Sequence, residues 1–270
     1  MAASNETKPD RLFDTAFVRP PSKSYANCIS SNPAKTEIDV TLAKKQHRTY
    51  VSILKESGIK IVELSPLESH PDSVFMQDPA LLGVGRSVIG RFREISRRGE
   101  EDALRTDLQA LKPAVGELNA IIDPGILEGG DILVTGDGLF VGESKRTNSS
   151  GINQLGAFLP RLKVTAVRTM LFHLLCGVTY LSNGVMIISP QLVEESNFPG
   201  FRFVEIPKED VYSCDALYLG EQRVLIPSGF PNTTSKLKEA GYSPVEIDVS
   251  EFYKGDGGVT CLSSPIYTVL

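Results

Sequence analysis

The sequence predicts a mixed α/β fold in which about five repeated units close into a ring around a central channel. One pattern recurs at a spacing of roughly 40 to 50 residues, namely two short apolar strands joined by a polar turn, then a helix and another strand. The chain also begins and ends on apolar strands, "FDTAFVRP" (13–20) and "PIYTVL" (265–270). Because unpaired apolar edges promote aggregation, we expect these two segments to pair and close the ring.

Each unit is expected to open with a β-hairpin. Tight turns such as Gly136-Asp137-Gly138 and Asn183-Gly184 lie between apolar runs, which is a strong local sign of a hairpin. The predicted hairpins cover residues 75–92, 128–144, 172–189, 214–229 and 257–270.

Helices are predicted between the hairpins. In segment 39–57, Asp39 is a good N-cap and Gly58 ends a pattern that places Ala43, His47, Tyr50, Val51 and Leu54 on one face. Further helices are predicted over 99–111, 147–159 and 233–240, and strands over 60–66 and 243–250. We expect one domain, residues 1–270, whose first twelve residues (1–12) form a flexible segment.

Composition excludes several classes of function. The chain has 270 residues, of which 41% are hydrophobic, and a net charge of −5, which argues against nucleic-acid binding. No apolar run approaches the roughly 20 residues of a membrane helix, and the N-terminal segment does not have the pattern of a signal peptide. We therefore expect a cytoplasmic protein, monomeric or homodimeric, with reduced thiols at Cys28, Cys176, Cys214 and Cys261.

Unusual polar residues fall at corresponding places in the units, and a ring would bring them together at its axis. A thiol, a histidine and an acid can together perform nucleophilic catalysis. Additional carboxylates indicate a cationic substrate, and two arginines indicate a carboxylate on the same substrate, since arginine binds carboxylates with two parallel hydrogen bonds. These residues are Asp72, Asp78, Arg97, Glu128, Asp131, Arg146, His173 and Cys261.

Each of these residues also has an ordinary structural interpretation. Cys261 could be a small core residue, and His173, in an apolar run, could be a buried core histidine. The arginines of "SRRGEE" could form a solvated face, and the glycines of "EGGD" and "GDGG" could serve bulges or turns. No cluster of histidines and cysteines suits a metal ion, so we expect neither metal nor cofactor.

Several longer motifs, in order and over nearly the whole chain, resemble those of dimethylarginine dimethylaminohydrolases. They are "PDSVFMQDP", "SRRGE", "LEGGDILVTGD", "FVGESKRTN", "FHLLCGVTYL" and "DGGVTC". This family belongs to the guanidine-modifying superfamily, with arginine deiminases and amidinotransferases. The resemblance implies a five-bladed α/β propeller, the pentein fold. It also implies hydrolysis of methylated arginine to citrulline and an alkylamine through a covalent cysteine intermediate, without a cofactor.

The resemblance also implies a role for each candidate residue. Cys261 would be the nucleophile, His173 the general acid and base, and Glu128 the acid that orients His173. The implied substrate contacts are Asp78 for the guanidinium, Asp72 and the backbone carbonyl of Ile29 for the amine, and Arg97 and Arg146 for the carboxylate. Ile29 would lie on a mobile lid loop.

Three positions depart from the family pattern. Gln77 stands where relatives usually have glutamate, Leu175 where bacterial relatives often have lysine, and Gly255 where they have a larger residue near the amine. The amide of Gln77 could be a tolerated change, or its NH2 group could face a different substrate. Gly255 could likewise leave space for a bulkier substrate.

Four functions are therefore considered. The first is hydrolysis of asymmetric dimethylarginine and monomethylarginine, and the second is deimination of arginine or hydrolysis of another guanidino or ureido compound. An amidinotransferase is a third, although known transferases are longer. A binding protein without catalysis is the fourth, and the presence of Cys261, His173 and Glu128 argues against it.

Overall fold

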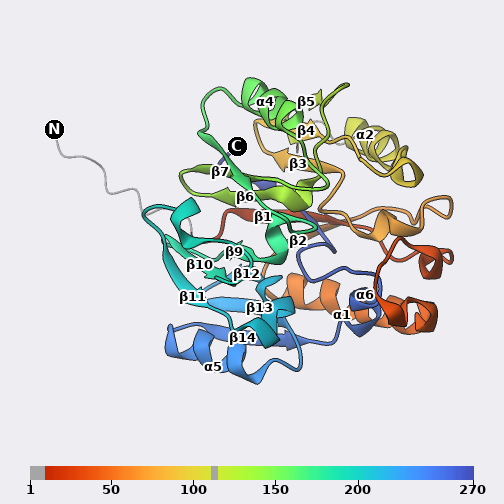
Figure 1. The fold of residues 1–270 in the computed structure, drawn as a ribbon. Coiled ribbons are helices and arrows are strands. Elements are labelled where there is room, and N and C mark those ends of the chain that lie inside the picture. The colour runs from red at the N-terminus through yellow and green to blue at the C-terminus, as the bar shows by residue number, and fades with distance from the viewer. Residues whose placement is uncertain (1–9, 111–114) are drawn as a thin grey trace.

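The sheets are built from a three-stranded group that occurs five times among the described residues, 10–110 and 115–270 of the computed structural model. In each group an antiparallel pair is followed by a strand parallel to its second member, as in β3–β4–β5 (Figure 1). The other groups are β6–β7–β8, β9–β10–β11, β12–β13–β14 and β15–β1–β2. The bounds are β1 Phe13–Val18, β2 Lys60–Glu63, β3 Ala80–Gly83, β4 Arg86–Ile89, β5 Glu117–Ala120, β6 Ile132–Thr135, β7 Gly138–Glu143, β8 Val164–Arg168, β9 Val178–Tyr180, β10 Val185–Ile188, β11 Arg202–Glu205, β12 Leu217–Gly220, β13 Arg223–Pro227, β14 Ser243–Ile247 and β15 Ser264–Tyr267.

The two ends of the chain complete one group together, as predicted. β15 pairs antiparallel with β1, with Phe13 opposite Tyr267 and Ala16 opposite Pro265. The hairpin predicted over 257–270 is wrong, because β15 is the strand of that segment and its antiparallel partner comes from the other end of the chain. β15 also pairs in parallel with β3, so two groups share one six-stranded sheet, β2-β1-β15-β3-β4-β5.

The predicted helices are confirmed within a few residues and lie at the periphery of the sheets (Figure 1). Asp39 caps α1, accepting hydrogen bonds from the N–H groups of Thr41 and Leu42. Residue 111, the end of one predicted helix, lies outside the described residues. The bounds are α1 Val40–Glu56, α2 Glu100–Ala110, α4 Ser149–Phe158, α5 Pro231–Glu239 and α6 Ser250–Tyr253, of which α6 was not predicted.

The third strands of three groups, β5, β8 and β11, had no predicted positions. Their sequences are ELNA, VTAVR and RFVE, and most of their residues are partly or fully exposed. Such strands lack the apolar run on which strand prediction depends. The segment between β10 and β11 contains a short 3₁₀ turn, Glu195–Asn197, where the repeat predicts a helix.

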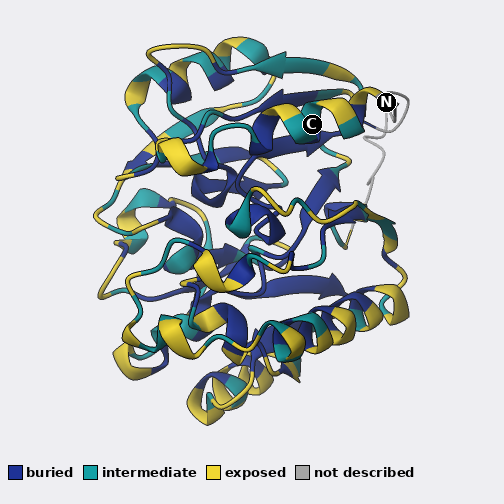
Figure 2. Ribbon diagram, turned by 90° about the vertical axis from the view of Figure 1, so that its right-hand side faces the viewer, coloured by how far each residue is buried: buried dark blue, intermediate teal, exposed yellow. Residues whose placement is uncertain are grey.

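The buried apolar side chains form clusters that join neighbouring groups. One cluster contains Leu81 and Val88 from β3–β4 together with Ile132 and Val141 from β6–β7. Another joins Val185 of β10 to strands β12 and β13. Figure 2 shows the strands mostly buried and the outer helix faces exposed. The apolar contacts thus lie between groups, while many of the loops between strands carry buried polar residues.

Residues 10–12, which were predicted to be flexible, make specific contacts. Arg11 donates hydrogen bonds to the carbonyls of Phe13, Ser57 and Leu219 at 2.6, 2.9 and 2.6 Å. The remainder of the predicted flexible segment, 1–9, lies outside the described residues. None of the described helices has the length and apolar character needed to cross a bilayer.

Candidate active site

Most of the predicted site residues meet in one narrow cavity. It is bounded by the turns between strands, including the 3₁₀ helices Pro71–Val74, Ile95–Arg97 and Leu174–Cys176. Its lining combines apolar walls with several charged side chains, so it suits a ligand with both apolar and charged parts. The lining residues are Ile29, Asp72, Phe75, Asp78, Arg97, Arg146, Phe172, His173, Cys176, Gly255, Asp256, Gly257 and Cys261.

His173 is held between two acids. Its Nε2 atom lies 2.9 Å from Oε2 of the fully buried Glu128, and its Nδ1 atom lies 3.7 Å from Oδ1 of Asp78. Burial favours the neutral imidazole, but the charges of Asp78 and Glu128 outweigh it and raise the pKa of His173 to about 9. His173 is therefore a cation at neutral pH, with Nδ1 facing Asp78.

The motif "EGGD" brings these groups together. A Cβ atom on Gly130 would lie 2.4 Å from Nδ1 of His173 and 2.9 Å from Oδ1 of Asp78. A Cβ atom on Gly129 would lie 2.0 Å from the carbonyl oxygen of Gln77. Both glycines lie in a 3₁₀ turn, Gly129–Asp131, as considered above. Neither has a positive φ, so it is the close approach of other groups that requires glycine at these two positions. Asp131 supports the same region by accepting a hydrogen bond from the N–H of Leu174.

Asp78 offers one free oxygen to the cavity. Its Oδ2 atom accepts a hydrogen bond from Nη1 of Arg97 at 2.6 Å, while its Oδ1 atom is buried and has no hydrogen-bond partner. Burial opposes ionisation, but the charges of His173 and Arg97 prevail and lower the pKa of Asp78. An ionised oxygen without a hydrogen bond is a strong acceptor for a cationic N–H group.

Arg97 is largely committed to protein partners. Besides Asp78, it donates to both oxygens of Glu100, at 3.1 and 2.9 Å, and it lies 4.1 Å from the ring centroid of Phe92. Glu100, the first residue of α2, thus fixes Arg97. Arg97 lines the cavity as predicted, but its hydrogen bonds make it a residue that orients Asp78.

Arg146 has more capacity to bind a ligand. Its guanidinium lies 4.2 Å from the ring centroid of Phe172, and its Nη1 atom is buried without a hydrogen-bond partner. That atom lies 3.6 Å from Glu128 and 3.7 Å from Glu94, both longer than a hydrogen bond. Arg146 therefore remains the better candidate for binding a substrate carboxylate.

The loop around Ile29 lies against the cavity. The N–H of Ile29 donates to both oxygens of Asp72, at 3.0 and 3.2 Å, which holds the loop at the cavity. The contact of the Ile29 carbonyl with a substrate amine stays a prediction. The next residues are held by the segment before Cys261, since Ser31 donates to Asp256 at 2.6 Å. Burial raises the pKa of Asp72.

Cys261 is half-buried at the cavity, just before β15. Burial, followed by the charges of Asp215 and Asp78, raises the pKa of its thiol well above the ordinary value. Its Sγ atom lies 3.7 Å from Oδ2 of Asp215. Sequence analysis missed Asp215, because a single acid before a strand is the usual composition of a turn.

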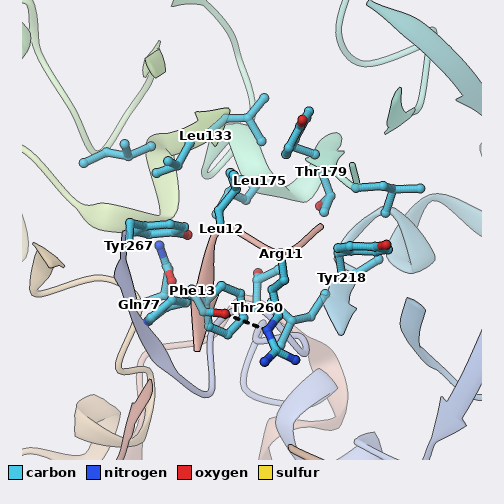
Figure 3. Close-up of a pocket in the computed structure, with 17 residues that line it drawn as sticks. Arg11, Leu12, Phe13, Gln77, Leu133, Leu175, Thr179, Tyr218, Thr260 and Tyr267 are labelled. Carbon is cyan, nitrogen blue, oxygen red and sulfur yellow. Dashed lines mark hydrogen bonds between the residues drawn. The ribbon is translucent and has the colours of Figure 1, made fainter. Parts of the chain in front are cut away.

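Gln77 does not reach this cavity, although it was predicted as a substrate contact. Its side chain lines a second cavity beside Tyr267 (Figure 3). Its NH2 group donates to the carbonyl of Gly129 at 3.3 Å. Its backbone N–H donates to the carbonyl of Cys261 at 3.2 Å, which fixes the chain at the thiol. Leu175, another of the three departures from the family pattern noted above, lines the second cavity too.

The two cavities are separated by a layer about one residue thick. The neighbours Gln77 and Asp78 each face a different cavity, and so do Thr260 and Cys261. Both pairs lie in turns that precede a strand, and the two side chains of each pair leave the turn on opposite sides. The interpretation in which the NH2 group of Gln77 faces the substrate is therefore wrong. The other interpretation, in which glutamine is a tolerated replacement for glutamate, agrees with the position of Gln77.

Gly255 lines the cavity only with its backbone. A Cβ atom there would lie 2.6 Å from the hydroxyl of Tyr25 and 3.2 Å from the sulfur of Cys28. Tyr25 is fully buried and already fills that space. The predicted room for a bulkier substrate at Gly255 is therefore not present in that direction.

The position of Gln77 gives a stability prediction. We expect Gln77→Glu to lower the free energy of unfolding by about 3 kcal/mol at pH 8, because the new carboxylate would be buried and would face the carbonyl of Gly129, to which the NH2 group of Gln77 donates. Its pKa would be higher in the folded than in the unfolded state, so the loss is present at high pH and relieved as pH falls. Urea denaturation at pH 8 and pH 5 measures this. The same change on the exposed Gln109 serves as control, and equal effects would contradict the placement.

Asp78, Glu128 and His173 also have the spacing of a metal-binding group, since their ligand atoms lie within 4.8 Å of one another. The imidazolium of His173, held between the carboxylates of Asp78 and Glu128, produces the same short distances between these atoms. The absence of a metal remains a prediction, tested with the activity assay below.

Comparison with known proteins extends over nearly the whole chain. A family model described as "N,N dimethylarginine dimethylhydrolase, eukaryotic" matches residues 17–268. An uncharacterised protein from Aeropyrum pernix is 41% identical over 268 residues, which is 97% of this chain and 98% of that protein. The N(G),N(G)-dimethylarginine dimethylaminohydrolase of Pseudomonas aeruginosa is 35% identical over 255 residues, 93% of this chain and 99% of that enzyme.

A solved structure shows the same fold. It is a cysteine-to-serine variant of the Pseudomonas aeruginosa enzyme complexed with citrulline. It aligns with a TM-score of 0.88 at 34% identity and covers 94% of this chain and 100% of its own.

Proposed function

The chain belongs to the dimethylarginine dimethylaminohydrolase family, and from that premise we propose that it hydrolyses asymmetric dimethylarginine and monomethylarginine to citrulline and dimethylamine or methylamine. The family makes it a hydrolase. The choice of substrate and the covalent route through Cys261 are parts of the proposal.

One observation carries the proposal. A buried anionic acceptor without a hydrogen bond, Oδ1 of Asp78, and a buried cationic donor without one, Nη1 of Arg146, line the same cavity as the Cys261 thiol. Buried groups of this kind are rare unless a ligand or water completes them. A guanidino amino acid has the matching charges, a cation for Asp78 and a carboxylate for Arg146.

The proposed first step is attack on the guanidinium. Asp78 holds the guanidinium plane, and the sulfur of Cys261 forms a bond to the central carbon. The C=N electron pair moves onto nitrogen, which neutralises the cation. His173, charged because of Asp78 and Glu128, then donates its proton from Nδ1 to the departing amine. A positively charged S-alkylisothiouronium remains on Cys261.

In the second step His173, now neutral, takes a proton from water as the water oxygen attacks the same carbon. The C–S bond breaks, the sulfur leaves with its electron pair, and the carbonyl of citrulline forms as the remaining hydroxyl proton passes to the released amine, which becomes an ammonium ion. Glu128 keeps the imidazole in one orientation through both steps, since it holds Nε2 at 2.9 Å. Phe75 and Phe172 supply apolar walls that suit N-methyl groups better than N–H groups.

The fold proposal is a five-bladed propeller in one domain. The five three-stranded groups and the apolar clusters between neighbouring groups support it. Such a ring explains why residues as distant in sequence as Asp78, His173 and Cys261 line one cavity.

A citrulline assay tests the function. We expect citrulline from asymmetric dimethylarginine and monomethylarginine, much less from arginine, and unchanged rates after treatment with EDTA. Equal rates with arginine would favour a deiminase. A rate lost with EDTA and restored by a divalent cation would contradict the metal-free mechanism. If no citrulline forms from any of the three, although Cys261 is still alkylated, the substrate assignment is wrong and the site assignment survives.

A further inference from the structure

Asp215 is a buried carboxyl group in contact with the proposed nucleophile. It lies between the 3₁₀ helix Lys208–Cys214 and β12 and is only 5% exposed. Its Oδ1 atom accepts hydrogen bonds from the N–H and the hydroxyl of Thr260, at 2.7 and 2.8 Å. Its Oδ2 atom is left for the sulfur of Cys261 at 3.7 Å, a normal distance for a thiol donor.

The protein backbone is shaped around this carboxyl group. A Cβ atom on Gly258 would lie 2.3 Å from Cγ of Asp215. The segment "GGVTC" can therefore approach Asp215 this closely only if residue 258 is glycine. The second glycine of the motif thus brings the chain that carries Cys261 against Asp215.

Asp215 differs from the other buried acids of the site in lacking a cation. Asp78 is paired with Arg97, and Glu128 with His173, whereas no lysine, arginine or histidine of the described residues forms an ion pair with Asp215. Burial accordingly raises the pKa of Asp215 to about 6. The titratable groups that interact with it are neutral or anionic at neutral pH: Tyr50, Asp78, Cys176, Tyr212, Cys214 and Cys261.

We infer that Asp215 controls the proton of the nucleophile: its carboxylate keeps Cys261 a neutral thiol in the free enzyme and receives that proton when a cationic substrate arrives. This inference rests on the proposed function. In the step, the S–H bond breaks as an O–H bond forms on Oδ2, and the sulfur electron pair forms the bond to the guanidinium carbon. When citrulline is released, the sulfur recovers its electron pair and takes the proton back. Charge is conserved, because the substrate cation is neutralised as Asp215 becomes neutral.

The test is Asp215→Asn, whose side-chain oxygen can still accept the bonds from Thr260. We expect iodoacetamide to alkylate Cys261 of the substrate-free variant at least about tenfold faster at pH 7, with the midpoint of the pH profile lowered by about one unit. We also expect the fall in kcat/KM below about pH 6 to disappear, because the group that must be ionised is gone.

Asp210→Asn is a matched control, since Asp210 is equally buried in the same 3₁₀ helix and accepts from the N–H and hydroxyl of Thr233. It should leave alkylation unchanged. Alkylation of Asp215→Asn no faster than wild type would overturn the inference. If the variant does not fold, a wild-type alkylation midpoint at or below the ~8.5 of free cysteine overturns it equally. Alkylation needs no turnover, so this result is independent of whether methylated arginine is the substrate.

Discussion

Cys261→Ser is expected to lower the rate of citrulline formation by at least about a thousandfold while leaving substrate binding nearly unchanged. A serine hydroxyl is a much weaker nucleophile at neutral pH than a cysteine sulfur. In the second step, the serine oxygen would also leave the carbon more slowly than the cysteine sulfur does. The groups that hold the substrate, Asp78 and Arg146, are not altered. Steady-state rates and calorimetric titration with asymmetric dimethylarginine measure the two effects separately.

The second thiol in the cavity provides the control. Cys176 lines the same cavity, yet neither its position nor the motif comparison gives it a role in the reaction. Cys176→Ser should keep most of the activity, and acid-quenched wild-type enzyme should carry a mass adduct on Cys261 alone. Turnover that survives in Cys261→Ser, or an adduct on Cys176, would show that the nucleophile is misassigned.

The part of the site that could be predicted from sequence consists of polar residues in unusual surroundings. Asp78, His173 and Cys261 each interrupt an apolar segment near a strand, and the repeat predicts that such positions converge. The pairing of the chain ends was predictable for a similar reason, since an exposed apolar strand at each end is unfavourable unless they meet. The resemblance to a known family supplied the individual roles.

The direction of a side chain was harder to predict than its place in the chain. Gln77 precedes Asp78 directly, but the two side chains leave the same turn on opposite sides, so Gln77 enters the second cavity. Asp215 escaped prediction because its role depends on Thr260 and Cys261, about 45 residues away in sequence. The weakly apolar strands β5, β8 and β11 escaped because neighbouring strands, not their own composition, determine them.

Glu128→Gln is expected to slow turnover by about a hundredfold or more and to shift its pH dependence. Glu128 is fully buried, holds Nε2 of His173 at 2.9 Å, and is one of the charges that raise the pKa of His173 to about 9. His173 must be protonated in the free enzyme to donate its proton to the leaving amine. Wild-type kcat/KM should therefore be retained up to about pH 9 and fall as pH rises through it.

Removal of the Glu128 charge lowers the pKa of His173, so the alkaline fall in kcat/KM should move to lower pH in Glu128→Gln, by about one unit or more. Titration of the thiol does not produce this fall, because its proton passes to Asp215 within the complex and not to the solvent. Glu94→Gln is a matched control, since Glu94 lies near Arg146 but is not one of the acids that hold His173. An alkaline fall at the same pH in both variants and the wild type would mean that the Glu128–His173 pair does not govern proton donation to the amine.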